Sequence, residues 1–585
     1  MANVINIQQF LVGKRLHIPV YQRDFAWGKQ QVGELFEDIQ EAVDNNHRHY
    51  LGTIVLAESD DGSFEVVDGQ QRISTLMLSI AAFLSQLEED DRQRLVHWAN
   101  FISQDGESLN LDFGINGQFV QGLLAGEQPE PRTAGQRRLL SAYQFALERA
   151  AEMRVSGGDA SIRSWVQAVI GLEIISFQAN DTGSAIRLFQ TVNDRGLPLS
   201  TMDKVKSLLI YHSNRYLEGA LDYQIAQCFG RCFRSYDWII ESVREPGFKI
   251  DTIAREAFSD NELIRYHYLS YQPPDALPQL MDTQDYDGYL RTVFDSFLKG
   301  NLQEIREDPA LLHVFIEDYV TDLAEFCEAF RNLVQLAKTE AQIYKLLVVL
   351  GLSVRLYPLA IRMLQRGLLF EEVAAPAVKL VDCIETVDLR VYKSRGTDPA
   401  RDVGLLSHRS RFSTITETAN ALLDFARRFA PDGLFRSWLT QDVYQNRGLV
   451  QMFLNREEDS RDESFSVEDL RELVHAQMSK EHILSQNPNS SIVDMGFADQ
   501  EDFDSHKHLI GNLTLLTKAE NSRCSHRNPR EKLTDPRLYP DSVYRMTRDL
   551  AHQYELDQFK PNKEMVLERT DSVADWVVER WPLWA

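Results

Sequence analysis

The residues from Phe64 to Leu87 constrain the fold more than any other stretch, because their apolar pattern changes from strand-like to helix-like across one turn. Val66 and Val67 are strand formers, and the Asp68-Gly69 dipeptide that follows is a turn signal. After the turn, apolar residues recur at helical spacing: Ile73, Leu76, Met77, Ile80, Leu84 and Leu87. The pattern therefore predicts a strand, a turn and a helix in direct succession.

Three polar residues, Gln70, Gln71 and Arg72, fall in the first turn of this predicted helix. Free backbone N–H groups and the helix dipole make that position favourable for an anion and slightly unfavourable for a lone arginine. A bound phosphate would reverse the second effect, because it would pair with the arginine. The spacing is equally compatible with an ordinary Asp-Gly turn followed by solvated polar side chains.

The segments around this turn predict a small α/β module. Residues 50–57 and 64–67 have strand character and are joined by a polar turn, so they predict a hairpin. Residues 30–43 predict an amphipathic helix, and residues 173–177 predict another strand. Ser200, with Asp203 three residues later, resembles a capping box that opens a helix.

The length and composition fit a large protein of several domains. A chain of 585 residues corresponds to three or four domains of about 150 residues each, and 43% hydrophobic residues suffice for their cores. The five cysteines have no zinc-binding spacing and are typical of reduced thiols. The first ten residues lack the pattern of a signal peptide, and the longest apolar region, 343–364, is interrupted by charges and a proline. We therefore expect a cytoplasmic protein that does not span a membrane.

The formal net charge of −25 argues against a nonspecific nucleic-acid binder unless basic residues cluster locally. One such cluster lies near the C-terminus, at Arg523, His526, Arg527, Arg530 and Lys532. Clusters of this kind are more often solvated surface than DNA contacts. The significance of this one depends on the motif that precedes it.

That motif consists of Glu481-His482 and, further on, His508, Asn512 and Asn521. Hydrolysis of a phosphodiester with a divalent ion needs a neutral imidazole that deprotonates water, oxygen ligands for the ion, and a group that holds the imidazole in place. Histidine, glutamate and asparagine can supply these functions. The alternative is a buried, hydrogen-bonded histidine beside turn-forming asparagines. Before this motif, residues 211–430 show mainly helical periodicity, and residues 456–464 predict a charged loop.

Both ends of the chain resemble the GmrSD-type restriction proteins, a group that includes the SspE-type nucleases. The N-terminal resemblance rests on four blocks: Ile18 to Trp27, Tyr50 to Leu56, Asp68 to Arg72 and Phe189 to Ser200. The C-terminal resemblance rests on Glu481 to Pro488 and His508 to Asn521, with Ser485 where the family usually has proline. The resemblance covers residues 1–210 and 430–585 and is weak between them.

The resemblance implies an α+β, helix-rich multidomain fold with three parts. Residues 1–210 would form a ParB/sulfiredoxin-like α/β module that binds and hydrolyses a nucleoside triphosphate, GTP or ATP. Residues 211–430 would form a helical connector, and residues 431–585 would form a ββα-metal (HNH-like) nuclease module. In the first module the implied nucleotide-binding residues are Tyr21, Gln22, Arg23, Asp68, Gly69, Gln70, Gln71 and Arg72, with Asn193, Asp194 and Arg195 as further candidates.

In the nuclease module the resemblance implies a role for each motif residue. His482 would be the general base, Glu481 and Asn521 would be the ligands of Mg²⁺ or Mn²⁺, and Asn512 would brace the loop that carries His482. His508 matches a family position among the catalytic residues. The basic residues implied to contact DNA phosphates are Arg523, Arg527 and Lys532.

The implied function is an NTP-coupled, metal-dependent DNA endonuclease of a phage-defence restriction system that senses modified DNA. Assembly of the chain into a homo-oligomer is compatible with this function. Two alternatives stay open. A nucleotide-gated regulatory protein would bind DNA without cutting it, and the net charge and Ser485 favour that interpretation. An enzyme of small nucleotides alone would hydrolyse NTP with no response to DNA.

Overall fold

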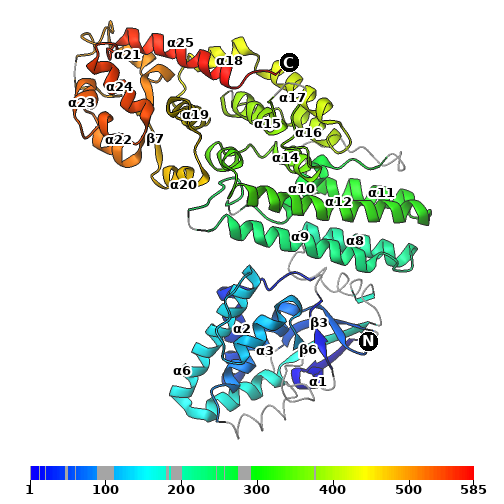
Figure 1. Ribbon diagram of the computed structural model, residues 1–585. Coiled ribbons are helices and arrows are strands. Elements are labelled where there is room, and N and C mark those ends of the chain that lie inside the picture. Colours follow the sequence, from blue (N-terminus) through cyan, green and yellow to red (C-terminus); the bar gives the residue numbers. More distant parts are fainter. Residues whose placement is uncertain are drawn as a thin grey trace. The chain divides into compact units, whose positions relative to one another are not determined.

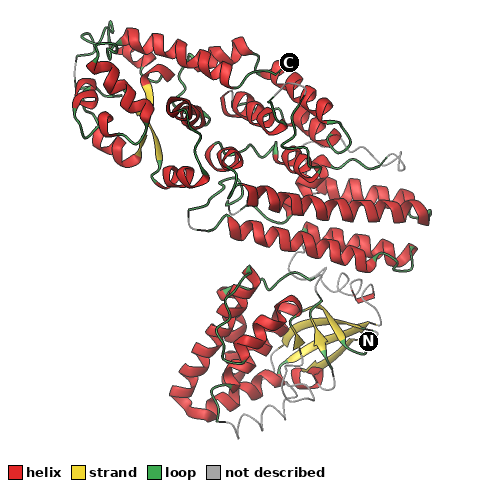
Figure 2. Cartoon of the chain, viewed as in Figure 1, coloured by secondary structure: helices red, strands yellow, loops and turns green. Residues whose placement is uncertain are grey.

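The computed structural model of the chain describes residues 2–11, 14–19, 22–45, 50–59, 61–88, 111–179, 184–185, 200–245, 247–255, 257–274, 291–373, 377–394, 396–489 and 491–584. Helices dominate these residues, and strands occur at two places (Figure 2). The predicted α+β, helix-rich class is therefore confirmed. All five cysteines are buried free thiols. None of the described helices is long and apolar enough to cross a membrane.

The chain divides into two compact units. Unit 1 comprises Met1–Trp238, Pro273–Thr283 and Leu290–Cys327. Unit 2 comprises Ile239–Gln272, Gln284–Tyr289 and Glu328–Ala585. The strands of the first sheet belong to unit 1, and the strands of the second belong to unit 2.

From the N-terminus to the middle of the chain (blue to green in Figure 1) the elements are β1 (Ala2–Asn6), α1 (Ile7–Leu11), β2 (Leu16–His17), α2 (Lys29–Asn45), β3 (Tyr50–Glu58), β4 (Phe64–Asp68), α3 (Gln70–Leu84), β5 (Leu111–Asp112), η1 (Gly114–Asn116), α5 (Gly117–Leu124), α6 (Ala134–Gly171), β6 (Glu173–Ala179), α8 (Thr201–Tyr216), α9 (Asp222–Ser242), α10 (Asn261–Ser270), η2 (Thr292–Leu298), α11 (Lys299–Ile305) and α12 (Pro309–Leu336).

The sheet of unit 1 has six strands in the order β1-β6-β3-β4-β2-β5. β3 and β4 pair antiparallel, as the predicted hairpin requires, whereas β3 and β6 run parallel. The mixed pattern places the end of β4, and with it the Asp68 turn, in the middle of the sheet. The strand predicted at 173–177 is present as β6, which pairs on both sides.

Helices α2, α3 and α6 gather on one side of this sheet (Figure 1). The apolar residues that predict α3 are all buried in the core between them, from Ile73 at 0% exposure to Leu87 at 8%. Phe83 of α3 stacks on Trp165 of α6, with ring centroids 3.6 Å apart. Burial of one apolar face therefore fixes α3 against the sheet and makes its N-terminus a rigid platform.

From the middle of the chain to the C-terminus (green to red in Figure 1) the elements are α13 (Ala341–Tyr344), η3 (Lys345–Val349), α14 (Tyr357–Gln365), α15 (Leu380–Val387), η4 (Asp388–Ser394), α16 (Ala400–Arg409), α17 (Ile415–Phe429), α18 (Asp432–Leu439), α19 (Leu449–Arg461), α20 (Val467–His475), β7 (Met478–His482), α21 (Gln500–His506), η5 (Ile510–Asn512), β8 (Leu513–Thr517), α22 (Lys518–Cys524), α23 (Pro529–Thr534), η6 (Tyr539–Asp541), α24 (Arg545–Glu555) and α25 (Lys563–Arg580).

The charged segment predicted as a loop at 456–464 lies largely in helix α19, so that prediction was wrong. Glu457, on α19, is fully buried and accepts hydrogen bonds from the backbone N–H groups of Arg545 and Met546 at 2.6 and 2.8 Å. These N–H groups open helix α24, where a carboxylate satisfies donors that lack intrahelical partners. At least one charged side chain of α19, Glu457, therefore stabilises the fold by capping the start of α24.

Arg390, on η4, is a buried arginine of unit 2. Its side chain is fully buried and donates to the carbonyl oxygens of Trp581 and Ala430 and to the carboxylate of Asp432. Its guanidinium also lies 4.6 Å from the ring centroid of Phe435. This arginine therefore fastens the C-terminal segment to the helices of the same unit.

Two candidate functional sites

The first candidate site begins at the turn between β4 and α3. Gly69 has φ +85°, a backbone conformation that side chains disfavour, and a Cβ there would lie 2.9 Å from the side chain of Ile54 and 3.2 Å from the carbonyl oxygen of Thr53. Only glycine fits this close approach to β3. Helix α3 then starts at Gln70 without a side-chain cap, so its first N–H groups face the turn.

The two glutamines after the turn fasten a segment that lies about 45 residues earlier. Gln71 Oε1 accepts hydrogen bonds from the N–H groups of Ala26 and Trp27 at 2.7 and 3.3 Å. Gln70 Nε2 donates to the carbonyl oxygen of Arg23 at 3.1 Å. In the same way, Gln22 Nε2 donates to the carbonyl oxygen of Val67. The glutamines therefore have structural partners, so their position in the first turn of α3 does not by itself indicate a ligand.

Arg72 also has a structural partner. Its Nη1 donates to the carbonyl oxygen of Thr53 at 2.8 Å, and its guanidinium crosses over Gly52, where a Cβ would lie 2.9 Å from Nη1. Gly52 has φ +119°, so both backbone conformation and space require glycine. Arg72 therefore joins the Tyr50 to Leu56 block to the Asp68 to Arg72 element. Because Arg72 already donates to Thr53, its position at the start of α3 does not require a bound phosphate.

A pocket of about 330 Å³ opens beside the turn. It is lined by Gln22, Arg23, Ala26, Trp27, Val67, Asp68, Gly69, Gln70, Gln71, Arg72, Asp203, Lys206 and Ser207. Within the described part of the chain, the buried Oε1 of Gln70 accepts no hydrogen bond. A buried acceptor without a donor is costly, so a ligand that donates an N–H or O–H group there would be stabilised.

The charged residues of this pocket come from segments of unit 1 that are far apart in the sequence. Arg23 Nη2 lies 3.4 Å from Asp203 Oδ2, and its guanidinium lies 4.4 Å from the ring centroid of Phe233. Burial lowers the pKa of Lys206 to about 8, against the opposing effect of Asp203. Burial raises the pKa of Asp68, while Arg72 and the Gly69 N–H act in the opposite direction. A buried lysine and two arginines face two carboxylates, which leaves one net positive charge for an anion.

Lys206 also lines this pocket, although it belongs to none of the sequence motifs. It lies on α8, whose predicted N-terminal cap is present: the Ser200 side chain accepts a hydrogen bond from the Asp203 N–H. The buried face of α8 includes Met202, Val205 and Leu209, and Lys206 lies within it at 8% exposure. A lysine inside the apolar stripe of a helix is the signal that could have identified it.

Some predicted residues of the nucleotide site lie outside the described residues. They are Tyr21 and the Asn193, Asp194 and Arg195 turn. The structure brings the other implied residues, from Gln22 to Arg72, to one pocket.

The second candidate site is built on β7, β8 and α22 of unit 2. β7 and β8 pair antiparallel, with Glu481 opposite Thr514 and His482 opposite Leu513, and α22 follows β8 directly. This is the strand, strand and helix order that the sequence predicts for the motif. Because side chains alternate along a strand, Glu481 and His482 point to opposite faces of β7.

Asn512 ties the loop after His482 to the loop before β8. Its Oδ1 accepts the N–H of Leu484 at 2.8 Å, and its Nδ2 donates to the carbonyl oxygens of Leu484 and Lys507 at 3.0 and 2.8 Å. The side chain is fully buried. These are the hydrogen bonds that the implied bracing role requires. Ser485, which replaces the family proline, is also fixed, because its hydroxyl donates to the carbonyl oxygen of Arg527 at 2.9 Å.

His482 lies between a histidine and an amide. Its Nε2 is 3.0 Å from His508 Nδ1, and its Nδ1 is 3.1 Å from Gln486 Nε2. An amide nitrogen can only donate, so Nδ1 of His482 accepts and the neutral ring carries its proton on Nε2, which donates to His508. Burial is the main cause that lowers the pKa of His482 to about 3, and nearby lysines act in the same direction. The ring is therefore neutral near pH 7, and in this buried arrangement it is a weaker base than an ordinary imidazole.

The ring of Tyr444 covers both imidazoles. Its centroid lies 4.6 Å from that of His482 and 5.0 Å from that of His508. The ammonium of Lys480 lies 4.8 Å from the same ring and donates to the carbonyl oxygen of Tyr444. Sequence motifs did not identify Tyr444, because it lies 38 positions before His482 and outside the motif.

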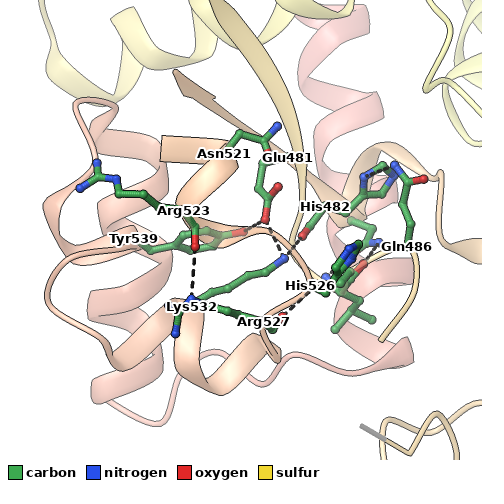
Figure 3. A network of polar contacts seen from close by, with 12 residues as sticks. Glu481, His482, Gln486, Asn521, Arg523, His526, Arg527, Lys532 and Tyr539 are labelled. Atoms are coloured by element: carbon green, nitrogen blue, oxygen red, sulfur yellow. Dashed lines mark hydrogen bonds and ion pairs between the residues drawn. The ribbon is translucent and has the colours of Figure 1, made fainter. Parts of the chain in front are cut away.

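The carboxylate of Glu481 forms an ion pair with the side chain of Lys532. The ammonium of Lys532 donates to the Glu481 carboxylate at 2.6 Å and to the carbonyl oxygen of His482 at 2.7 Å, and the Tyr539 hydroxyl donates to the same carboxylate at 3.3 Å (Figure 3). Lys532 is fully buried. Its prediction as a DNA-phosphate contact is therefore wrong, because the ammonium is already paired inside unit 2.

The implied metal ligands do not fit a divalent ion as they are arranged here. The Glu481 carboxylate is paired with Lys532, and the Asn521 amide donates to Ser479 Oγ and to the carbonyl oxygen of Lys480. Across the described residues, no group of three or more His, Cys, Asp or Glu side chains is arranged to hold a metal ion. Arg523 and Arg527 are exposed beside this site, as a DNA contact requires (Figure 3).

The fold and the two sites describe a multidomain protein in which one unit has an α/β sheet and the other carries a histidine site on a strand–strand–helix motif. Two family models match the chain: the GmrSD restriction endonuclease N-terminal domain at residues 7–210 and the GmrSD restriction endonuclease C-terminal domain at residues 432–569. The chain belongs to the GmrSD restriction endonuclease family. No curated protein matches it.

Proposed function

We propose that the chain is an NTP-coupled DNA endonuclease of the HNH type, dependent on a divalent metal ion, that senses modified DNA in a restriction system. Family membership gives the restriction nuclease and its DNA partner. The observation that supports the finer assignment is the position of His482: it lies at the end of β7, the loop that follows it is braced by Asn512, and exposed arginines lie beside it.

The proposed chemistry is hydrolysis of a phosphodiester. The oxygen of a water molecule attacks phosphorus, the bond to the leaving oxygen breaks, and His482 accepts the proton of the water. At rest both ring nitrogens of His482 are engaged, by Gln486 and by His508. One of these partners has to release the ring before it can accept a proton. Gln486 is the partner that leaves a lone pair when it moves, because it donates to the unprotonated Nδ1.

Metal dependence is proposed from the motif alone: in the structure Glu481 is paired with Lys532, so an ion bound to Glu481 would have to displace that ammonium. Chelation tests the dependence. We expect the purified chain to convert supercoiled plasmid into nicked or linear forms in Mg²⁺ or Mn²⁺, and EDTA to stop the conversion. Modified and unmodified plasmids, each with and without GTP or ATP, separate sensing and coupling from cleavage. A plasmid that stays supercoiled under every condition would support the regulatory protein that binds DNA without cutting it.

Nucleotide binding is assigned to the pocket of unit 1, where Lys206 gives the clearest test. Variants of Gln70 or Arg72 also lose hydrogen bonds that hold the segment before α2 and strand β3, so they do not isolate a ligand contact. Lys206→Met should weaken GTP or ATP binding about ten- to a hundredfold, because one charge-assisted bond to a phosphate is lost.

The matched control is Lys204→Met, because Lys204 is exposed two positions earlier on the same helix. Titration calorimetry of the full chain measures both affinities, and thermal unfolding checks that both variants fold. Equal nucleotide affinity in the two variants would remove Lys206 and this pocket from the nucleotide site.

A further inference from the structure

A second pocket of unit 2 lies outside both sites described above. It measures about 690 Å³, which is within the range of ligand pockets. Its wall comes from the loops that follow η3 and η4 and from the segment between Trp438 and Arg447.

The charges of this pocket nearly cancel. Arg355 pairs with Asp398 through two short contacts, at 3.0 and 2.8 Å, and Lys393 lies 3.6 Å from the buried Asp388. Asp442, also in the wall, accepts the N–H of Tyr444 within its own loop. Arg447 is exposed, and none of the described carboxylates pairs with it. Such a lining, with one unpaired cation among its described residues, suits a ligand with one negative charge, such as a phosphodiester.

The uncharged part of the lining suits a nucleobase. Trp438 supplies an aromatic face, and Gln441 and Asn446 supply amides, which can bond to the edge of a base. The hydroxyl oxygens of Tyr392 and Thr397 are buried in the wall, and within the described residues neither has a hydrogen-bond partner. Buried hydroxyls of this kind favour a polar ligand that satisfies them.

The segment that lines this pocket also contacts the histidines of the nuclease site. The N–H of Val443 donates to the carbonyl oxygen of His508 at 3.3 Å. The next residue is Tyr444, whose ring lies on His482 and His508. Its neighbours Val443 and Gln445 line the pocket. The pocket and the candidate catalytic histidine therefore share one wall, a few residues thick.

We propose that this pocket receives one nucleotide of the DNA strand whose phosphodiester lies at His482, with the base against Trp438 and its phosphate on Arg447. The inference rests on the proposed nuclease function and adds a subsite to it. A base can enter such a pocket only when it leaves the duplex stack, so a nucleotide seated there also positions the strand. Because the wall is shared, the same nucleotide also contacts the segment around Val443 and Gln445, which positions Tyr444 against His482.

The test uses the full chain with His482→Ala, so that binding is measured without cleavage. DNA that carries 5-bromouracil in place of thymine is irradiated on the protein, and the crosslinked peptides are identified by mass spectrometry. We expect a crosslink at Trp438. We also expect Arg447→Ala to weaken DNA binding about tenfold and to lower the dependence of log affinity on log salt by about 1, because one phosphate contact is lost.

The matched control is Arg427→Ala, which removes an exposed arginine of unit 2 that lines neither this pocket nor the pocket of unit 1. Crosslinks confined to other residues, together with equal DNA affinity and salt dependence in Arg447→Ala and Arg427→Ala, would overturn the proposal. Loss of GTP or ATP binding in Arg447→Ala, with DNA binding unchanged, would assign the pocket to a free nucleotide instead. The binding and crosslinking readouts need no cleavage, so they stay interpretable even if the plasmid assay shows none.

Discussion

Replacing His482 by alanine is expected to lower DNA cleavage by about a hundredfold to ten-thousandfold while NTP hydrolysis continues. The candidate base lies in unit 2, and the proposed nucleotide pocket is lined by residues of unit 1 alone. His508 is less suited to act as the base, because its Nδ1 lone pair already accepts the proton of His482 Nε2. Plasmid cleavage and phosphate release are measured on one preparation of the full chain.

The control for this prediction is His475→Ala, which removes an exposed histidine of the same unit. It should leave both activities unchanged. If His482→Ala removes NTP hydrolysis as thoroughly as DNA cleavage in a folded protein, the model with two separate sites is wrong, and a single composite site replaces it.

The second large effect is expected on stability, from the buried pair of Lys532 and Glu481. Lys532→Met leaves the Glu481 carboxylate buried at 5% exposure without its cation, so the free energy of unfolding should fall by about 3–5 kcal/mol. Glu481→Gln together with Lys532→Met should recover much of this loss, because no unpaired charge remains. Denaturant unfolding of the two single variants and the double variant gives the coupling energy.

A matched control for the pair is Lys507→Met, since Lys507 forms a more exposed ion pair with Asp504 at 2.7 Å. Its effect should stay below about 1 kcal/mol. Additive losses in Glu481→Gln and Lys532→Met would contradict a direct pairing of the two side chains.

The sequence predicts local structure around Asp68 well, because strand, turn and helix signals are contained within two dozen neighbouring residues. The hairpin, the start of α3 and the buried face of α3 all agree with the pattern. The roles of Gln70, Gln71 and Arg72 were not predictable in this way. Their partners lie 19 to 47 positions away, and only the fold brings a carbonyl oxygen or N–H group to each side chain.

The errors in unit 2 have the same origin. Lys532 belongs to a run of basic residues that is typical of a DNA-binding surface, yet its partner Glu481 lies 51 positions earlier and draws it into the core. The His482, Asn512 and His508 constellation was easier to recognise, because its members share a motif with fixed spacing. Tyr444 and the pocket beside it have no such motif, so the structure alone identifies them.

The burial of Glu457 beneath the start of α24 determines where this protein can be divided. A fragment that begins after α19 would leave the N–H groups of Arg545 and Met546 without their acceptor and would strip one wall from β8. Division at the charged segment 456–464, which the sequence alone predicts as a loop, would therefore yield an unstable piece. An independently folding nuclease fragment has to start before Leu449, and it keeps Tyr444 over its histidines only if it includes the segment from Trp438 onward.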